Sequence, residues 1–178
     1  MSAHPLPRGA TSELITVALS ATICAPRERV WRAVIDPAER AAWDERILGE
    51  VSLSRGTLKA EASVRSRPGK QTSLRKTRWR FILGNVPLVM QDEIIRADRH
   101  DRLLSRISIG SMHFDQTLTL HTEDDETGPR TRLGMKVVSR NKITVIGEVV
   151  PQINVQKLVI EYVDSTLRQV QKHCEADA

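Results

Sequence analysis

Apolar and polar side chains alternate over most of the stretch from residue 74 to residue 141, and turn residues interrupt the alternation at short intervals. This pattern is typical of antiparallel strands with one buried face. We expect strands over 74–83, 88–97 and 102–109, a fourth that ends before the acidic loop 122–130, and a fifth after that loop. The chain is therefore expected to fold around an antiparallel sheet.

Parity tests the expected hairpins, because residues paired across antiparallel strands point to the same face. Pairing Leu83 with Leu88 places Phe81 opposite Met90 and Trp79 opposite Asp92. The hairpin through Gly110 and Ser111 pairs Ile109 with Met112, Ile107 with Phe114, Ser105 with Gln116 and Leu103 with Leu118. The last strand then turns Leu133, Met135 and Val137 inward. All of these pairings are consistent with one buried face of the sheet.

Helical patterns occur on both sides of this strand region. Residues 13–23 alternate like a strand, and a short helix over 26–35 follows, with Pro26 suited to a first helical turn. Asp36 can cap a second short helix over 38–43. Near the C-terminus, a long helix over 148–173 is expected to face the sheet. Its apolar stripe is Val149, Ile153, Gln156, Ile160, Val163, Leu167, Val170 and Cys174.

Length and composition limit the remaining choices. The 178 residues suit one domain, which we place at 13–175 after a flexible tail at 1–12, while the strand layout from 47 to 69 stays open. No window approaches 18 consecutive apolar residues, and the first ten residues do not form a secretory signal. The two cysteines have no metal or disulfide spacing. We therefore expect a cytoplasmic protein.

The net charge of +5 is a feature of many proteins that bind nucleic acid. However, the chain has only six aromatic residues for base stacking, and its basic residues are interleaved with acidic ones. The sequence argues against that partner. Lys76, Arg78 and Arg80 form an outward basic stripe. We interpret it as a solvated face, with contact to an acidic partner or peripheral contact with an anionic membrane surface as the alternative.

The N-terminal motif carries a family resemblance. The run Ala21-Thr22-Ile23-Cys24-Ala25-Pro26-Arg27-Glu28-Arg29-Val30-Trp31, followed by Ile35-Asp36-Pro37 and Trp43, resembles the opening of the START/SRPBCC superfamily. The bacterial polyketide cyclase/dehydrase-like and lipid-binding branches are the relevant members. The resemblance implies an α+β helix-grip fold, in which a curved seven-stranded antiparallel sheet wraps a long C-terminal helix after two short helices. It also implies a cavity between the sheet and that helix.

The inward phase includes polar side chains as well as apolar ones. Asp92, Ser105 and Gln116 fall on three neighbouring strands, with Asp92 diagonal to Ser105 at about 7 Å. They form either a polar seam that orients a ligand or incidental polar positions in a wet cavity, unless a bulge turns Asp92 outward. A buried carboxylate needs hydrogen bonds or an ion pair. Arg75 either binds a ligand oxygen or extends to the cavity mouth.

The apolar wall of the expected cavity consists of Trp79, Phe81, Met90, Ile107, Met112, Phe114 and Met135. Flexible methionines in such a wall suit either core packing or an irregular ligand. On the helix, Ile160 is expected to face the sheet, and Gln156 is either a ligand contact or a boundary residue. Tyr162, the single tyrosine, lies off the predicted stripe.

Three functions remain open. The first is binding of a hydrophobic or amphipathic small molecule, such as a lipid, an isoprenoid or a polyketide-like compound. The second is an enzyme of the polyketide cyclase/aromatase kind, with Asp92 as candidate general base and Arg75 or Gln116 to stabilise an enolate. The third is a protein-interaction module of the chaperone-activator kind. The five histidines form no metal or triad arrangement, and no phosphate-binding loop occurs, so no metal and no cofactor is expected. The ligand and the oligomeric state stay open.

Overall fold

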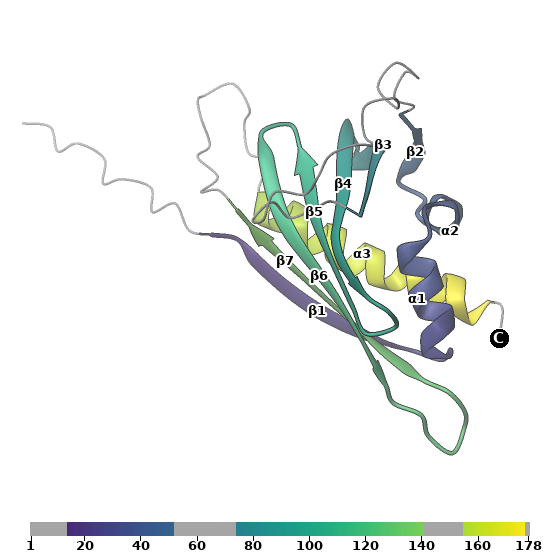
Figure 1. The fold of residues 1–178 in the computed structure, drawn as a ribbon. Coiled ribbons are helices and arrows are strands. Elements are labelled where there is room, and N and C mark those ends of the chain that lie inside the picture. Colours follow the sequence, from purple (N-terminus) through teal and green to yellow (C-terminus); the bar gives the residue numbers. More distant parts are fainter. Residues whose placement is uncertain (1–13, 52–73, 141–154, 177–178) are drawn as a thin grey trace, which may run out of the picture.

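The computed structural model describes residues 14–51, 74–140 and 155–176, and these form one antiparallel sheet and three helices (Figure 1). The strands are β1 (Thr16–Ile23), β2 (Ile47–Glu50), β3 (Arg75–Leu83), β4 (Val86–Asp98), β5 (Arg102–Ile109), β6 (Met112–Thr122) and β7 (Thr131–Ser139). The helices are α1 (Arg27–Ile35), α2 (Pro37–Trp43) and α3 (Val155–Glu175). The expected tail at 1–12 lies outside the described residues.

The sheet contains seven strands in the order β1-β7-β6-β5-β4-β3-β2, with each neighbouring pair antiparallel. Figure 1 shows α3 lying across one face of the curved sheet, with α1 and α2 gathered near the C-terminal end of α3. Apolar side chains from the inward phase of the strands meet α3 in one core. The α+β helix-grip architecture expected from the sequence is confirmed.

The two short helices begin where the sequence predicts. Pro26 is the N-cap of α1, one residue earlier than the expected first-turn position. Asp36 caps α2 as predicted, because its side chain accepts a hydrogen bond from the backbone N–H of Ala38 at 2.9 Å. Trp43 ties the two helices together, since its indole N–H donates to the Ala33 carbonyl at 2.8 Å.

The β5–β6 hairpin has the predicted register, with Ser105 opposite Gln116 and Ile107 opposite Phe114. The β3–β4 register was predicted wrongly. Leu83 pairs with Val86 rather than with Leu88, so that Trp79 lies opposite Met90 and Asp92 lies opposite Thr77. The physical reason is a two-residue turn.

Gly84 and Asn85 make that turn, and both have positive φ, at 54° and 66°. Positive φ at both central residues belongs to the tight hairpin turn that matches the twist of the strands. β4 therefore begins two residues earlier than expected, at Val86, while β3 ends at Leu83 as expected. Because the shift is two residues and not one, every side chain keeps the predicted face.

The buried face of α3 differs from the predicted stripe at three positions. Ile160 is 43% exposed and Gln156 is exposed as well, so neither faces the sheet. Tyr162 is buried at 6% exposure, against the expectation that it lies off the stripe. The predicted stripe repeats every 3.5 residues on average, whereas a helix turns every 3.6, so the two drift apart by about 20° per heptad. Val149 and Ile153 lie outside the described residues.

The buried face of α3 consists of Val159, Tyr162, Val163, Thr166, Leu167, Val170 and Cys174. Its N-terminal half approaches the β3–β4 turn closely: a Cβ built on Gly84 would lie 2.8 Å from Cδ2 of Leu158. The small residue in the turn thus allows the helix to sit against the hairpin.

Val163→Asp tests this helix placement. Val163 is fully buried, so an unpaired carboxylate at this position should lower the free energy of unfolding by about 3 kcal/mol or more. Ile160→Asp on the exposed face is the matched control and should change it by less than about 1 kcal/mol. Urea denaturation measures both. Equal losses in the two variants would contradict the observed phase.

Candidate functional site

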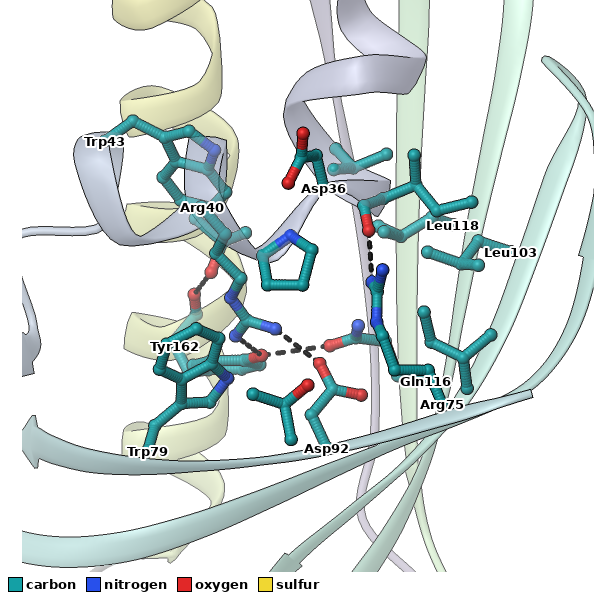
Figure 2. Close-up of a pocket in the computed structure, with 16 residues that line it drawn as sticks. Asp36, Arg40, Trp43, Arg75, Trp79, Asp92, Leu103, Gln116, Leu118 and Tyr162 are labelled. Carbon is teal, nitrogen blue, oxygen red and sulfur yellow. Dashed lines mark hydrogen bonds and ion pairs between the residues drawn. The ribbon is translucent and has the colours of Figure 1, made fainter. Parts of the chain in front are cut away.

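A polar pocket lies where α2 and α3 meet the inner face of β3, β4 and β6 (Figure 2). Its free volume is about 30 Å³, which is room for one or two water molecules. The walls come from Val34, Ile35, Asp36, Pro37, Arg40, Trp43, Arg75, Thr77, Trp79, Asp92, Ile94, Leu103, Gln116, Leu118, Tyr162 and Thr166. Charged and hydrogen-bonding groups are concentrated here within an otherwise apolar interior.

An ion pair between Arg40 and Asp92 occupies the centre of the pocket. Arg40 reaches inward from α2 and is only 8% exposed, and one terminal nitrogen of its guanidinium donates to Oδ2 of Asp92 on β4. Nε of Arg40 lies 3.7 Å from Oδ2 of Asp44. Asp92 thus has the partner that an inward carboxylate requires. No bulge turns it outward, since the irregularity in β4 lies between Ile94 and Arg96.

Tyr162 connects this ion pair to the polar residues of the neighbouring strands. Its hydroxyl donates to Oε1 of Gln116 at 3.0 Å, and Nε2 of Gln116 donates to Oγ of Ser105 at 3.2 Å. Arg40 in turn donates to the Tyr162 oxygen at 3.4 Å. Burial raises the pKa of the Tyr162 phenol above its usual value, so the hydroxyl stays protonated and able to donate at neutral pH.

Arg46, between α2 and β2, holds Tyr162 in place. Its guanidinium carbon lies 5.0 Å from the centre of the Tyr162 ring and 5.1 Å from that of Phe81. It also donates to the Tyr162 carbonyl at 3.1 Å and to the Thr166 hydroxyl at 2.8 Å. The fully buried Asp44 neutralises it, with Nε of Arg46 2.7 Å from Oδ1. These contacts fix the aromatic ring between a cation and the sheet.

A second pocket, with apolar walls, lies on the other side of Tyr162. Its free volume is about 40 Å³. It is lined by Leu83, Met90, Ile107, Ile109, Met112, Phe114, Val137, Val155, Leu158, Val159 and Tyr162. Of the described residues, Tyr162 alone lines both pockets, and its hydroxyl belongs to the polar side. The interior is therefore divided into a polar and an apolar compartment.

The structure distributes the sequence-predicted site residues among these compartments. Arg75, Trp79, Asp92 and Gln116 line the polar pocket, and Met90, Ile107, Met112 and Phe114 line the apolar one. Ser105 is buried beside Gln116, and Phe81 packs edge-on against Tyr162 with ring centres 6.2 Å apart. Met135 is buried without lining either pocket, and Gln156 and Ile160 are exposed on α3.

Arg75 lies partly exposed at the polar pocket, and its role in binding a ligand oxygen stays a prediction. It lines the pocket while only half-buried, and its guanidinium donates to the carbonyl of Ile35, the last residue of α1. A guanidinium at a helix C-terminus is favoured by the helix dipole. Arg75 therefore closes one side of the pocket and stays accessible there.

Sequence reasoning missed Arg40, Arg46 and Tyr162. The helical spacing of Val155, Leu158, Val159 and Tyr162 carried a signal for the tyrosine, because these positions continue the face of Val163. Arg40 had no comparable signal. Its helix has seven residues, and its partner Asp92 lies 52 positions further along the chain.

Among the residues that the structure describes, no group of three or more histidine, cysteine or acidic side chains is placed to hold a metal ion. No helix in this part of the chain combines the length and apolar character needed to cross a membrane.

Comparisons with known proteins agree on the fold. The structure is similar to an aromatase/cyclase from Streptomyces sp. R1128, with a TM-score of 0.68, 15% identity, and coverage of 92% of this chain and 94% of that one. It is also similar to a START superfamily protein from Mycobacterium smegmatis, with a TM-score of 0.63, 14% identity, and coverage of 92% and 99%. A protein from Thermus thermophilus gives a TM-score of 0.64, 19% identity, and coverage of 92% and 99%.

The chain has the START/SRPBCC helix-grip fold. No protein-family model matches its sequence, and no curated protein matches it either. At these identities the likeness establishes the architecture, and the chemistry has to be argued from the residues of the site.

The buried ion pair predicts a specific pattern of stabilities. Asp92→Ala leaves the Arg40 charge buried without its main partner and should lower the free energy of unfolding by about 3–5 kcal/mol. The double variant Arg40→Met/Asp92→Leu removes both charges and should recover most of that loss. Urea denaturation of Arg40→Met, Asp92→Leu and the double variant gives the coupling, and the same measurement on Asp92→Ala gives the loss on removing one partner. A loss below about 1 kcal/mol for Asp92→Ala would contradict the pairing.

Proposed function

We propose that the protein binds a hydrophobic or amphipathic small molecule between the sheet and α3. The observation that supports this most directly is the division of the interior into an apolar and a polar pocket that meet at Tyr162. A small-molecule site combines mainly apolar walls with a few polar groups that set orientation. In our proposal the ligand's apolar body lies against Met90, Ile107 and Phe114, and its polar end points toward Arg40 and Asp92.

The free volumes set a condition on this binding. Drug-sized ligands occupy pockets of about 300–1,000 Å³, well above the volumes of the two compartments. Side chains must therefore move to admit a ligand. Tyr162 divides the compartments, and Met90 and Met112 line the apolar one with flexible thioether chains. In our proposal the methionines repack and the Tyr162 ring leaves the position in which Arg46 and Gln116 hold it here, so that the two spaces join into one cavity.

Met112→Trp tests the proposal by filling the apolar pocket at a partly buried position. The probe is N-phenyl-1-naphthylamine, a neutral apolar compound whose fluorescence rises on transfer from water. We expect saturable binding to the unmodified protein and at least tenfold weaker binding to the variant, about 1.4 kcal/mol. Val89→Trp, on the outer face at 51% exposure, is the control and should bind like the unmodified protein. Equal affinity of Met112→Trp and the unmodified protein would contradict the proposal.

A second candidate function is a cyclase-type enzyme that uses Asp92 as general base. One observation favours it: Tyr162, which the sequence analysis placed off the site, is a buried hydrogen-bond donor next to the Arg40–Asp92 pair. In such a reaction Oδ1 of Asp92 would take a proton from the carbon alpha to a carbonyl, and Arg40 and Tyr162 would stabilise the enolate oxygen.

Asp92→Asn separates the two functions. In a pure binder the substitution should change ligand affinity by about tenfold at most. In an enzyme of this kind it should abolish turnover of a poly-β-ketone substrate while the same compound still binds. Turnover by Asp92→Asn at the rate of the unmodified protein would rule out the catalytic role.

A further inference from the structure

Besides Nε of Arg40, which lies 3.7 Å from Oδ2 of its ion-pair partner Asp44, two polar atoms in the polar pocket are buried and lack a hydrogen-bond partner among the described residues. One is the indole Nε1 of Trp79, whose side chain belongs to a residue with 3% exposure. The other is Oδ1 of Asp92, whose second oxygen already accepts from Arg40. Figure 2 shows both side chains rising from the sheet into the same pocket. Buried polar groups are nearly always paired, so these two atoms indicate what a bound molecule would supply.

The two atoms need opposite kinds of hydrogen-bond partner. The Trp79 N–H is a donor only, and the free Asp92 oxygen is an acceptor only. A carboxylate or phosphate end would satisfy Trp79 but would bring further acceptors toward Asp92. A hydroxyl can donate to Asp92, and a hydroxyl or carbonyl oxygen can accept from Trp79. Hydroxyl and carbonyl groups on one neutral molecule therefore fit both.

The charges that line the pocket lead to the same result. Arg40 and Arg75 are balanced by Asp36 and Asp92. Behind them, Arg46 is balanced by Asp44. An ionic ligand end would add an unbalanced charge in a region where Arg40 and Asp92 already neutralise each other, and that is unfavourable away from water.

We infer that the polar end of the ligand is neutral and carries a hydroxyl group that donates to Oδ1 of Asp92, rather than a carboxylate or a phosphate. The inference rests on the proposed function and specifies its ligand class. It separates alcohols, phenols and hydroxy-ketones from fatty acids and phosphorylated lipids.

The test compares 2-naphthol with 2-naphthoate, which share one apolar body and differ in the polar end. Isothermal titration calorimetry at neutral pH should show that the unmodified full-length chain binds 2-naphthol at least tenfold more tightly. Asp92→Asn leaves one positive charge unbalanced, so it should reverse the preference in favour of 2-naphthoate. Arg40→Gln/Asp92→Asn restores the balance and should restore the preference for 2-naphthol.

Trp79→Phe removes the indole N–H but keeps an aromatic ring at this position and leaves both charges of the ion pair in place. It should weaken 2-naphthol binding several-fold, and by more than it weakens N-phenyl-1-naphthylamine binding. If Asp92→Asn does not fold, the comparison of the unmodified chain with Trp79→Phe still tests the inference.

Preference of the unmodified chain for 2-naphthoate, or equal affinity for the two compounds, would overturn the inference. An unchanged preference in folded Asp92→Asn would also overturn it. Binding of N-phenyl-1-naphthylamine without binding of 2-naphthol overturns this inference but leaves the proposed function in place. Absence of binding by all three compounds contradicts the proposed function itself.

Discussion

The buried ion pair between Arg40 and Asp92 is the interaction on which the interior of this protein depends. Two charges held away from water are tolerated when they pair closely, and a polar atom that they leave unpaired, such as Oδ1 of Asp92, carries a cost that a bound molecule can remove. This requirement fixes α2 over the end of the sheet, since Arg40 must reach a carboxylate on β4. It also places Tyr162, because the phenol accepts from Arg40 and donates to Gln116. The polar pocket is the space between α2, Tyr162 and the sheet when Arg40 makes these contacts.

A curved sheet around a straight helix explains why such a space exists. The helix contacts the sheet along the face that includes Val163, Leu167 and Val170, all of them buried. Tyr162, in the N-terminal half of α3, borders both pockets. Arg46 braces the same residue from the other side through its contacts with the ring and the carbonyl. The packed face and the two pockets thus lie along the same helix.

Local pattern in the sequence was enough to predict the sheet but not the site. Alternation determines the face of each strand residue, and a register error of two residues at Gly84 and Asn85 preserved that face. This is why Asp92, Ser105 and Gln116 were correctly grouped in the interior. Tyr162 was misplaced because a regular heptad spacing is not the same as the 3.6-residue turn of a helix. Arg40 could not be assigned, since its orientation comes from a partner distant in sequence.

The indole resonances of the protein test the central claim most directly. The chain has three tryptophans, and Trp31 lines neither pocket, so its signal serves as an internal reference. A ¹H–¹⁵N spectrum with Trp79 assigned by Trp79→Phe should follow a titration with 2-naphthol. The account predicts that the Trp79 indole proton moves downfield with saturation as it gains an acceptor, while the Trp31 signal stays in place. Saturable binding of 2-naphthol with an unmoved Trp79 signal would contradict the account.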